Sequence, residues 1–384
     1  MPDALVPYFH QLLGQEELVN RFSSLVKEDR LPHAILLAGE DGGEAMPLAL
    51  AMSRQILCEE LSEEGQPCGH CPSCRMMDKL EHPDLTLSYP VVRIDEKTTS
   101  QDYFKSFQEL LSKHTRFTES EWRDMQDAKN KQLQIMVAEA ERLIKATSLR
   151  SFKSRHQVVL MWMPEMLRVE TANKLLKLLE EPPVGVIFIL VSHQPSKLLP
   201  TILSRLQRFI VPAIPEPLLA HYLLKECQLP ETKALEYAHL AQGSLYRAIS
   251  LSSGNSPELI QMERAVELLR LPMQRDPKLF LEQSKEIAAL NRPEVVSLLE
   301  TIPMVLREVL ALSYGDEIVV YLPEKLKEGC REVAQFLDAQ NIPSLMEDVN
   351  AAINEVRQNA NVRIVFFDLL LNTAMLYSKG ARLS

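Results

Sequence analysis

One loop near the N-terminus has the frame of a phosphate-binding loop without its charged groups. An apolar stretch, residues 33–38, runs into the glycines that begin at Gly39, and a helix-forming stretch follows. A working loop of this kind ends in Gly-Lys-Ser/Thr, whose lysine neutralises the β- and γ-phosphates and whose hydroxyl ligates magnesium. Glu44, Ala45 and Met46 stand in those three places. We therefore expect no functional ATP site, because a carboxylate faces the phosphates where a cation is needed.

A second apolar stretch, residues 158–161, is where an ATPase of this type carries an acidic pair, one aspartate for magnesium and one glutamate that orients water. Trp162 and Met163 occupy those two positions. Glu165 follows two residues later, and two interpretations are open for it. It is either a catalytic carboxylate or a solvated carboxylate at a strand end, and we favour the second because lone surface charges are common. Two separate segments have thus lost the groups that phosphoryl transfer needs.

Four of the six cysteines lie close together in the sequence. Cys58, Cys68, Cys71 and Cys74 have the spacing C-x9-C-x2-C-x2-C. Four thiolates at about 2.3 Å satisfy a tetrahedral zinc ion, and a site with all four positions filled leaves no place for a substrate. We therefore expect a structural zinc module at residues 58–74. A redox-active Cys-x-x-Cys pair and unliganded thiols are the alternatives.

Length and composition limit the class of protein. At 384 residues the chain fits two or three domains of about 100–200 residues each. With 46% hydrophobic and 24% charged residues it is typical of a soluble globular protein. A net charge of −10 argues against binding nucleic acid over the whole surface, which favours a protein partner. No apolar run approaches the roughly 20 residues that span a bilayer, and the N-terminus lacks a signal-peptide pattern, so we expect a cytoplasmic protein.

The apolar stretches that carry these motifs predict strands, at residues 35–37, 158–161 and 186–191. Near-continuous apolar strands separated by helices are typical of a parallel sheet covered on both faces. We therefore predict an α/β nucleotide-binding architecture. A polar stretch at about residues 92–131, rich in Lys, Glu, Asp, Ser and Gln, interrupts this pattern. It has the character of an insertion, and its composition indicates no function.

The pattern becomes wholly helical after Pro212. Short helical segments up to about residue 254 are followed by longer ones that prolines interrupt. We predict three domains: an α/β domain at residues 1–212, a small helical lid at 213–254 and an all-helical domain at 255–384.

Four motifs occur in an order that resembles one protein family. They are Leu-Pro-His-Ala-Ile-Leu-Leu-Ala-Gly at 31–39, the cysteine module, Ala-Asn-Lys-Leu-Leu-Lys-Leu-Leu-Glu-Glu-Pro-Pro at 172–183, and Leu-Pro-Thr-Ile-Leu-Ser-Arg at 199–205. Over about residues 1–255 the chain resembles bacterial clamp-loader subunits of the AAA+ family. The helical C-terminal part matches only in length and class, and the stretch at 92–131 departs from the family's pattern.

The resemblance implies a sliding-clamp loader of DNA polymerase III. Such a loader is a ring of subunits, held together by C-terminal collar domains, that opens the clamp and places it on primed DNA. The implied partners are the gamma/tau and delta subunits. The sliding clamp and primed DNA are contacted through the assembled complex, and no membrane is involved. The altered phosphate loop and acidic pair imply a stator, a subunit that hydrolyses nothing itself.

The resemblance also assigns a role to Arg205. Ser204 and Arg205 stand where the family carries its Ser-Arg-Cys motif, with Leu206 in place of the uncharged cysteine. The motif implies an arginine finger, a guanidinium that reaches the γ-phosphate bound by the neighbouring subunit; such a group is worth about 10³–10⁵ in rate. The fit of arginine to phosphate favours this role. The alternative is an arginine in a surface salt bridge.

The sensor positions agree with a site that has lost its function. Ser192 and His193 end the third strand, where a polar side chain of active relatives would touch the γ-phosphate, and Tyr246 stands where those relatives place an arginine. With the lysine and the aspartate replaced, these residues have little to sense.

Two other functions remain as alternatives. The first is an active ATPase with an atypical loop, which would need a cation in place of Ala45 and an acid in place of Trp162. The second is a zinc-containing nucleic-acid-binding protein, which the acidic composition disfavours. Nothing in the chain resembles a polymerase active site, so any DNA-directed polymerase activity belongs to the holoenzyme.

Overall fold

The computed structural model describes residues 5–128, 131–148, 151–252, 256–315 and 322–380. Contacts within the chain divide it into two compact units. The first comprises Met1–Leu219 with Gln242–Tyr246, and the second comprises Ala220–Ala241 with Arg247–Ser384. The division into three domains, with a separate helical lid at 213–254, stays a prediction.

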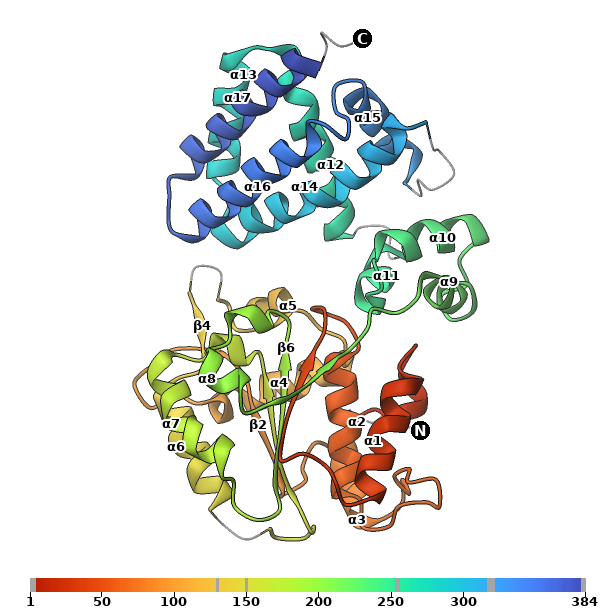
Figure 1. Cartoon of the computed structure of the whole chain (residues 1–384), viewed down its shortest axis with the longest axis vertical. Coiled ribbons are helices and arrows are strands. Elements are labelled where there is room, and N and C mark those ends of the chain that lie inside the picture. The colour runs from red at the N-terminus through yellow and green to blue at the C-terminus, as the bar shows by residue number, and fades with distance from the viewer. Residues whose placement is uncertain (1–4, 129–130, 149–150, 253–255, 316–321, 381–384) are drawn as a thin grey trace. The chain divides into compact units, whose positions relative to one another are not determined.

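A parallel five-stranded sheet forms the centre of the first unit (Figure 1). Its strands, in spatial order, are β2 (Leu85–Ser88), β5 (Gln157–Trp162), β6 (Val186–Ser192), β1 (Ala34–Ala38) and β7 (Gln207–Ile210). Every neighbouring pair is parallel. Because β6 lies between β1 and β5, Ala38 is beside Ser192 and Trp162 is beside Val191. The predicted α/β architecture with a parallel sheet is confirmed.

Helices cover both faces of this sheet, and Figure 1 shows α1 and α2 on one side and α6 and α7 on the other. Side chains of a strand alternate between the two faces. Ile35 and Leu37 therefore pack in the same core as α1 (Glu16–Lys27) and α2 (Ala45–Leu57). Leu36, between them, packs in a second core with α6 (Val137–Thr147) and α7 (Val169–Glu180). Burial on both faces explains why β1 and most of β5 and β6 are apolar, whereas the edge strand β7 exposes Gln207, Arg208 and Ile210.

The remaining elements of the first unit are short. They are η1 (Phe9–Gln11), α3 (Pro72–Asp78), β3 (Val91–Val92), η2 (Ser100–Tyr103), α4 (Phe104–Lys113), α5 (Glu119–Met125), β4 (Leu133–Gln134), η3 (Pro164–Met166), η4 (Pro195–Lys197) and α8 (Pro200–Leu203). Strands β3 and β4 form an antiparallel pair outside the main sheet. The elements η2, α4 and α5 lie within the predicted insertion at 92–131, which therefore folds as part of this unit.

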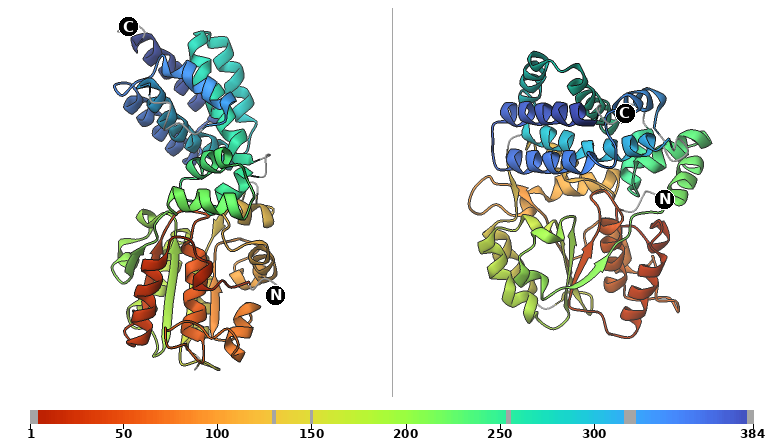
Figure 2. Two further views of the ribbon diagram at one scale, coloured as in Figure 1. Left: turned by 90° about the vertical axis from the view of Figure 1, so that its right-hand side faces the viewer. Right: turned by 45° about the horizontal axis from the view of Figure 1, so that its top comes forward.

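The chain after β7 is helical, as predicted. Its elements are α9 (Glu216–Lys225), α10 (Glu231–Leu240), α11 (Leu245–Ser252), α12 (Pro257–Arg270), η5 (Leu271–Gln274), α13 (Pro277–Ala288), α14 (Arg292–Ser313), α15 (Glu324–Ala334), α16 (Ile342–Arg357) and α17 (Val362–Gly380). In the second unit α14 packs against α12, α15 and α16, and α17 packs against α13 and α16 (Figure 2). Among the described residues, no helix is both long enough and apolar enough to cross a membrane.

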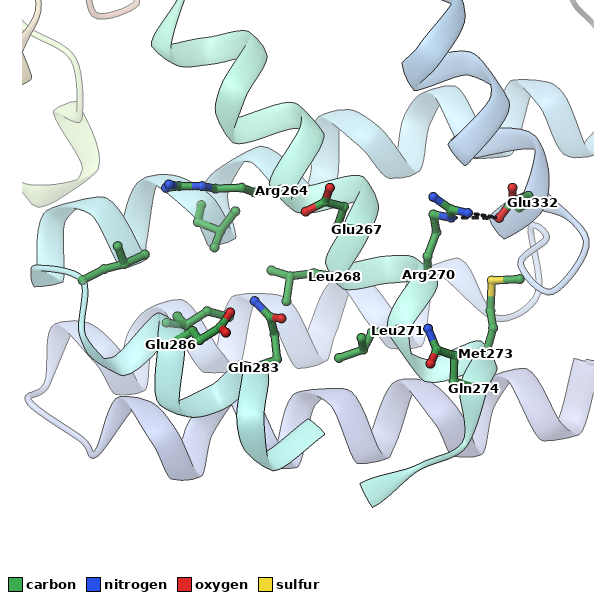
Figure 3. A pocket seen from close by; sticks show the side chains of 13 residues that line it. Arg264, Glu267, Leu268, Arg270, Leu271, Met273, Gln274, Gln283, Glu286 and Glu332 are labelled. Atoms are coloured by element: carbon green, nitrogen blue, oxygen red, sulfur yellow. Dashed lines mark hydrogen bonds and ion pairs between the residues drawn. The ribbon is translucent and has the colours of Figure 1, made fainter. Parts of the chain in front are cut away.

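A cavity of about 620 Å³ lies in the second unit, lined mainly by residues of α12, η5 and α13, with Leu298 of α14 and Glu332 of α15. Figure 3 shows charged side chains of both signs around it, among them Arg264, Glu267 and Glu286. Arg270 is paired with Glu332, with 2.7 Å between Nη2 and Oε2. This mixed lining does not offer the concentrated positive charge that the phosphates of a nucleotide require.

Candidate functional site

The altered phosphate-binding loop has the strand–loop–helix frame that the sequence predicts. Strand β1 ends at Ala38, and α2 begins at Ala45 with Glu44 as its N-cap residue. Gly42 has a φ of +70°, a conformation that favours glycine. A Cβ on Gly39 would lie 3.0 Å from the Cβ of Ala45. The turn itself therefore requires these glycines, whether or not a phosphate is bound.

Glu44 does not face an open phosphate pocket. Its side chain is fully buried, and its carboxylate pairs with Nε and Nη2 of Arg116 at 2.6 and 3.1 Å. Nη2 of Arg116 also donates to the carbonyl of Gln11 at 3.0 Å. Burial raises the pKa of Glu44, and the Arg116 guanidinium opposes that rise. The carboxylate that was expected to repel phosphates is thus paired with an arginine from the predicted insertion.

The loop makes hydrogen bonds within the chain. The backbone N–H of Gly43 donates to the carbonyl of Glu40 at 3.1 Å. The side chain of Asp41 accepts the backbone N–H of Glu119 at Oδ2, with a distance of 3.0 Å. The loop is therefore bonded both to itself and to the first residue of α5.

Side chains from two other segments cover Gly42. A Cβ placed on this glycine would lie 3.1 Å from Cγ2 of Thr118 and 3.1 Å from Cβ of Tyr246. The ring of Tyr246 stacks on His114, with centroids 5.7 Å apart. Tyr246, at the position where active relatives place an arginine, therefore covers the loop with an uncharged ring.

Trp162 and Met163, at the two acidic positions, are 1% and 3% exposed. The indole N–H of Trp162 donates to Nε2 of His193 at 2.9 Å. Because an indole nitrogen can only donate, we assign the ring proton of His193 to Nδ1, which lies 3.3 Å from the carbonyl oxygen of Gly39. One chain of hydrogen bonds thus joins the acidic position, the sensor position and the phosphate loop to each other.

Aromatic rings attach the predicted insertion to the end of β5. Phe117 meets Trp162 edge to face, with ring centroids 4.9 Å apart. Phe107 lies 5.6 Å from Phe117 and 5.2 Å from Trp122, and Tyr89 stacks on Phe107 at 3.9 Å. All five rings are at most 2% exposed. The insertion is therefore anchored in the core of the first unit.

Glu165 is half-buried, and its carboxylate supports the backbone after β6. Oε1 accepts the backbone N–H groups of His193 and Gln194 at 2.9 and 3.1 Å. The interpretation of Glu165 as a solvated carboxylate is therefore wrong. Ser192, the other sensor position, is fully buried, and its carbonyl accepts the backbone N–H of Gly39 at 3.2 Å.

The four clustered cysteines converge in space. The Sγ atom of Cys58 lies 3.7, 4.0 and 3.6 Å from those of Cys68, Cys71 and Cys74, and all four atoms lie within 4.8 Å of one another. Sulfurs bound at about 2.3 Å to one tetrahedral ion are about 3.8 Å apart, so the spacing and the donor set fit a metal ion. All four thiols are free, because these distances far exceed the roughly 2 Å of a disulfide bond.

Arg54 joins the cysteine module to α2. Its fully buried guanidinium pairs with Oδ1 of Asp78 at 2.7 Å and donates to the carbonyl of Val6 at 2.6 Å. It also lies over the ring of Tyr8, 4.1 Å from the centroid. Asp78 is the last residue of α3, the helix that contains Cys74. The module is therefore coupled to the helix that begins at the phosphate loop.

Arg205 lies at the surface, directly after α8 and Ser204. Its side chain is 28% exposed and pairs with the 58% exposed side chain of Glu180, at 2.9 Å between Nη2 and Oε2. Nη1 donates to the carbonyl of Thr201 at 2.8 Å. Within the single chain, Arg205 thus forms the surface salt bridge that was the alternative to an arginine finger.

Sequence reasoning singled out Glu44 but missed Arg116 and the pairing of the two residues. The two residues of the pair are 72 positions apart, and Arg116 lies in a stretch that reads as polar. The only available signal was the aromatic content of that stretch, since Phe107, Phe117 and Trp122 are unusual in a solvated insertion.

A family model and several relatives match this chain to subunits of DNA polymerase III. The family model described as DNA polymerase III, delta subunit matches residues 14–214. DNA polymerase III subunit delta' of Bacillus subtilis is 23% identical over 360 residues, which are 93% of this chain and 95% of that protein. DNA polymerase III subunit tau/gamma of Haemophilus influenzae is 27% identical over 249 residues, 64% of this chain, and the chain spans only 30% of its length.

Two solved structures are similar over most of the chain. The gamma subunit-related protein of Thermotoga maritima has a TM-score of 0.40 and 14% identity, with 94% of this chain and 99% of that one covered. The clamp loader delta protein of Bacillus subtilis has a TM-score of 0.32 and 9% identity, with 93% and 99% covered.

Proposed function

The chain belongs to the DNA polymerase III delta-subunit family, and from this premise we propose that it is a non-catalytic stator subunit of a clamp loader, of the delta-prime type. It assembles with gamma/tau and delta subunits in the cytoplasm, and the complex loads a sliding clamp onto primed DNA. The match to the Bacillus subtilis delta' subunit along 95% of its length supports this assignment. The shorter match to tau/gamma subunits supports partners of the same family.

The observation that carries the non-catalytic role is the pairing of Glu44 with Arg116. Phosphoryl transfer depends on positioned cations and a metal ion that neutralise charge on the phosphates. At the loop, the side chain of Glu44 is engaged by Arg116, and Ala45 and Met46 are buried and uncharged. At the acidic positions, Trp162 donates to His193 and carries no carboxylate. These side chains offer a triphosphate neither a cation nor a metal ligand.

The test of this role compares the purified chain with the assembled loader. We expect no ATP turnover by the chain in the presence of magnesium. We expect DNA-dependent ATPase and clamp loading when gamma/tau and delta subunits, the clamp and primed DNA are added, and a loss of both when this chain is left out. ATP turnover by the purified chain at a rate comparable to that of the loader would contradict the proposal.

Arg205 is proposed to act in trans as an arginine finger. Its position after α8 is partly exposed, and its partner Glu180 is more than half exposed. Exposed ion pairs of this kind contribute about 0–1 kcal/mol, so the guanidinium can leave Glu180 for the γ-phosphate of a neighbour at small cost. Arginine presents its donors as a planar fork that matches phosphate oxygens.

The cysteine module is proposed to hold zinc in a structural role. Four thiolates are the donor set that zinc prefers, and such a set leaves no open coordination position for a substrate. Bound zinc would stabilise a segment that is otherwise short of regular structure, since α3 is its one helix among the described elements. The contact through Arg54 would then transmit this stability to α2.

The helical C-terminal region is proposed to be the oligomerisation domain, or collar. The last helix, α17, is apolar on most of its circumference, yet Ile364 and Met375 on it are 67% and 57% exposed. A helix that is apolar all round is normally buried. Exposed apolar side chains on such a helix favour contact with another protein chain, in agreement with the protein partners expected from the acidic composition.

A further inference from the structure

The loss of the lysine, the hydroxyl and the acidic pair explains why ATP is not hydrolysed, but it leaves open whether nucleotide is still bound. We propose that residues 116–119, here called the loop cover, permanently close the phosphate-binding loop and are fastened there by Glu44. On this view the chain excludes nucleotide instead of binding it without turnover. The inference goes beyond the proposed function, which concerns catalysis alone.

The fastening is the ion pair between Glu44 and Arg116. Two nitrogen–oxygen contacts of 2.6 and 3.1 Å give it the bidentate geometry that fixes orientation as well as distance. The Glu44 side chain is fully buried and that of Arg116 is 18% exposed, so each charge depends on the other for compensation. Glu44 therefore holds Arg116, and with it the loop cover, against the start of α2.

The loop cover contacts the loop at Gly42 and Asp41. Glycines in such a loop allow backbone N–H groups to close around phosphate oxygens. Here Thr118 takes up the space beside Gly42, and the backbone of Glu119 is bonded to Asp41. The N–H of Gly43 already has an acceptor within the loop. A phosphate could enter only if these contacts were broken.

The packing of Phe117 indicates a fixed cover and not a gate that opens. Its ring lies against Trp162 and Phe107, and all three side chains are at most 2% exposed. Lifting the segment would expose these rings to water, which apolar surface strongly opposes. On the other flank the ring of His114 stacks on Tyr246, which covers Gly42, with ring centroids 5.7 Å apart. The cover is therefore held on both sides of Arg116.

Hydrogen exchange tests the fastening directly, because the amide of Glu119 is bonded to Asp41 of the loop and exchanges when that contact opens. The test variant is Arg116→Gln. The matched control is Arg93→Gln, the same change elsewhere in the insertion, at an arginine whose pair with Glu96 is exposed on both sides. We expect exchange at Glu119 to rise at least about tenfold in Arg116→Gln, a change of about 1.4 kcal/mol in the free energy of opening, and to stay unchanged in Arg93→Gln.

A second variant covers the case in which Arg116→Gln does not fold. Glu44→Gln keeps a neutral acceptor for Arg116, so we expect exchange at the Glu119 amide to become faster, but by a smaller factor. Unchanged exchange in a folded variant of either residue would overturn the proposal.

Nucleotide binding is the second readout. Titration of the wild-type chain with ATP up to about 1 mM, which would detect even weak affinity, is expected to give no binding. Binding of ATP by the wild-type chain would overturn the loop cover and leave the non-catalytic role standing. Turnover of ATP, in contrast, would defeat the proposed function itself, so the two failures are distinguishable.

Discussion

Replacement of Arg205 by alanine separates an arginine finger from a surface salt bridge, because the two roles predict effects of very different size. In the single chain the substitution removes the contact to Glu180, whose side chain is 58% exposed, and one bond to the carbonyl of Thr201. An exposed pair contributes about 0–1 kcal/mol. For a unit of this size that corresponds to a fall in melting temperature of at most about 4 °C.

The effect of a finger on catalysis is much larger. Loss of such a group lowers the rate at the affected site by about 10³–10⁵, or about 4–7 kcal/mol of transition-state stabilisation. The affected site is the ATP held by the neighbouring subunit, so the DNA-dependent ATPase of the assembled loader should fall by the share that this interface contributes. Binding of ATP by that neighbour should change little, because the finger acts mainly in the transition state.

The assay compares loaders reconstituted with wild-type, Arg205→Ala and Glu180→Gln chains. Glu180→Gln breaks the same ion pair but leaves the guanidinium in place. It should therefore lower the melting temperature of the chain about as much as Arg205→Ala does, while the loader keeps its full ATPase rate. Arg205→Lys should recover only part of the rate, because lysine keeps the charge without the planar fork. Equal ATPase rates for Arg205→Ala and Glu180→Gln, in loaders that assemble normally, would refute the finger.

Three further predictions concern the first unit. Cys71→Ser should abolish stoichiometric zinc and lower the melting temperature, because a structural metal site contributes directly to folding; unchanged zinc content and melting would refute the zinc module. In a double-mutant cycle measured by chemical denaturation, Arg116→Gln alone should lower the free energy of unfolding by about 3–5 kcal/mol, because it leaves the buried carboxylate of Glu44 uncompensated. Adding Glu44→Gln should recover part of that loss. Losses that simply add in the double mutant would argue against a coupled pair. A hydrogen bond to Glu121 raises the pKa of His114 above 6.5, so its stabilising effect is fully present below pH 6.5 and is lost as the pH rises through the raised value. The difference in melting temperature between wild type and His114→Gln should shrink with rising pH accordingly, and a difference independent of pH would contradict this.

The sequence predicted the three central strands of the sheet, β1, β5 and β6, because the physical signal for each of them is local, but it did not predict the edge strands β2 and β7. Strands buried on both faces are apolar at every position, and the stretch at 186–191 accordingly lies inside β6 (Val186–Ser192). The cysteine cluster was predictable for the same reason, since its members are neighbours in the sequence and a turn is enough to bring their sulfurs together. Local patterns of this kind do not depend on the rest of the fold.

The contacts that define the altered site could not be predicted. Arg116 reaches Glu44 across 72 residues, and no periodicity or spacing relates the two positions. Glu44 therefore appeared to be an uncompensated charge in a phosphate pocket, and the insertion appeared to be solvated. Arg205 presents a different difficulty, because its proposed partner is a phosphate on another chain, so neither the sequence nor the fold of this chain contains the second half of the site.

The Glu44–Arg116 pair connects two departures from the family pattern that the sequence presents as unrelated, the carboxylate in the phosphate loop and the insertion at 92–131. A buried glutamate without Arg116, or a buried arginine without Glu44, would each leave an uncompensated charge in the core. Trp162, at the acidic position, belongs to the same network of contacts. Its ring packs against Phe117 of the insertion, its indole N–H donates to His193, and His193 is hydrogen-bonded to the carbonyl of Gly39. With the loop cover closed as proposed, restoring the lysine of the loop alone would not recreate an ATP site, because the cover's contacts with Gly42 and Asp41 would remain.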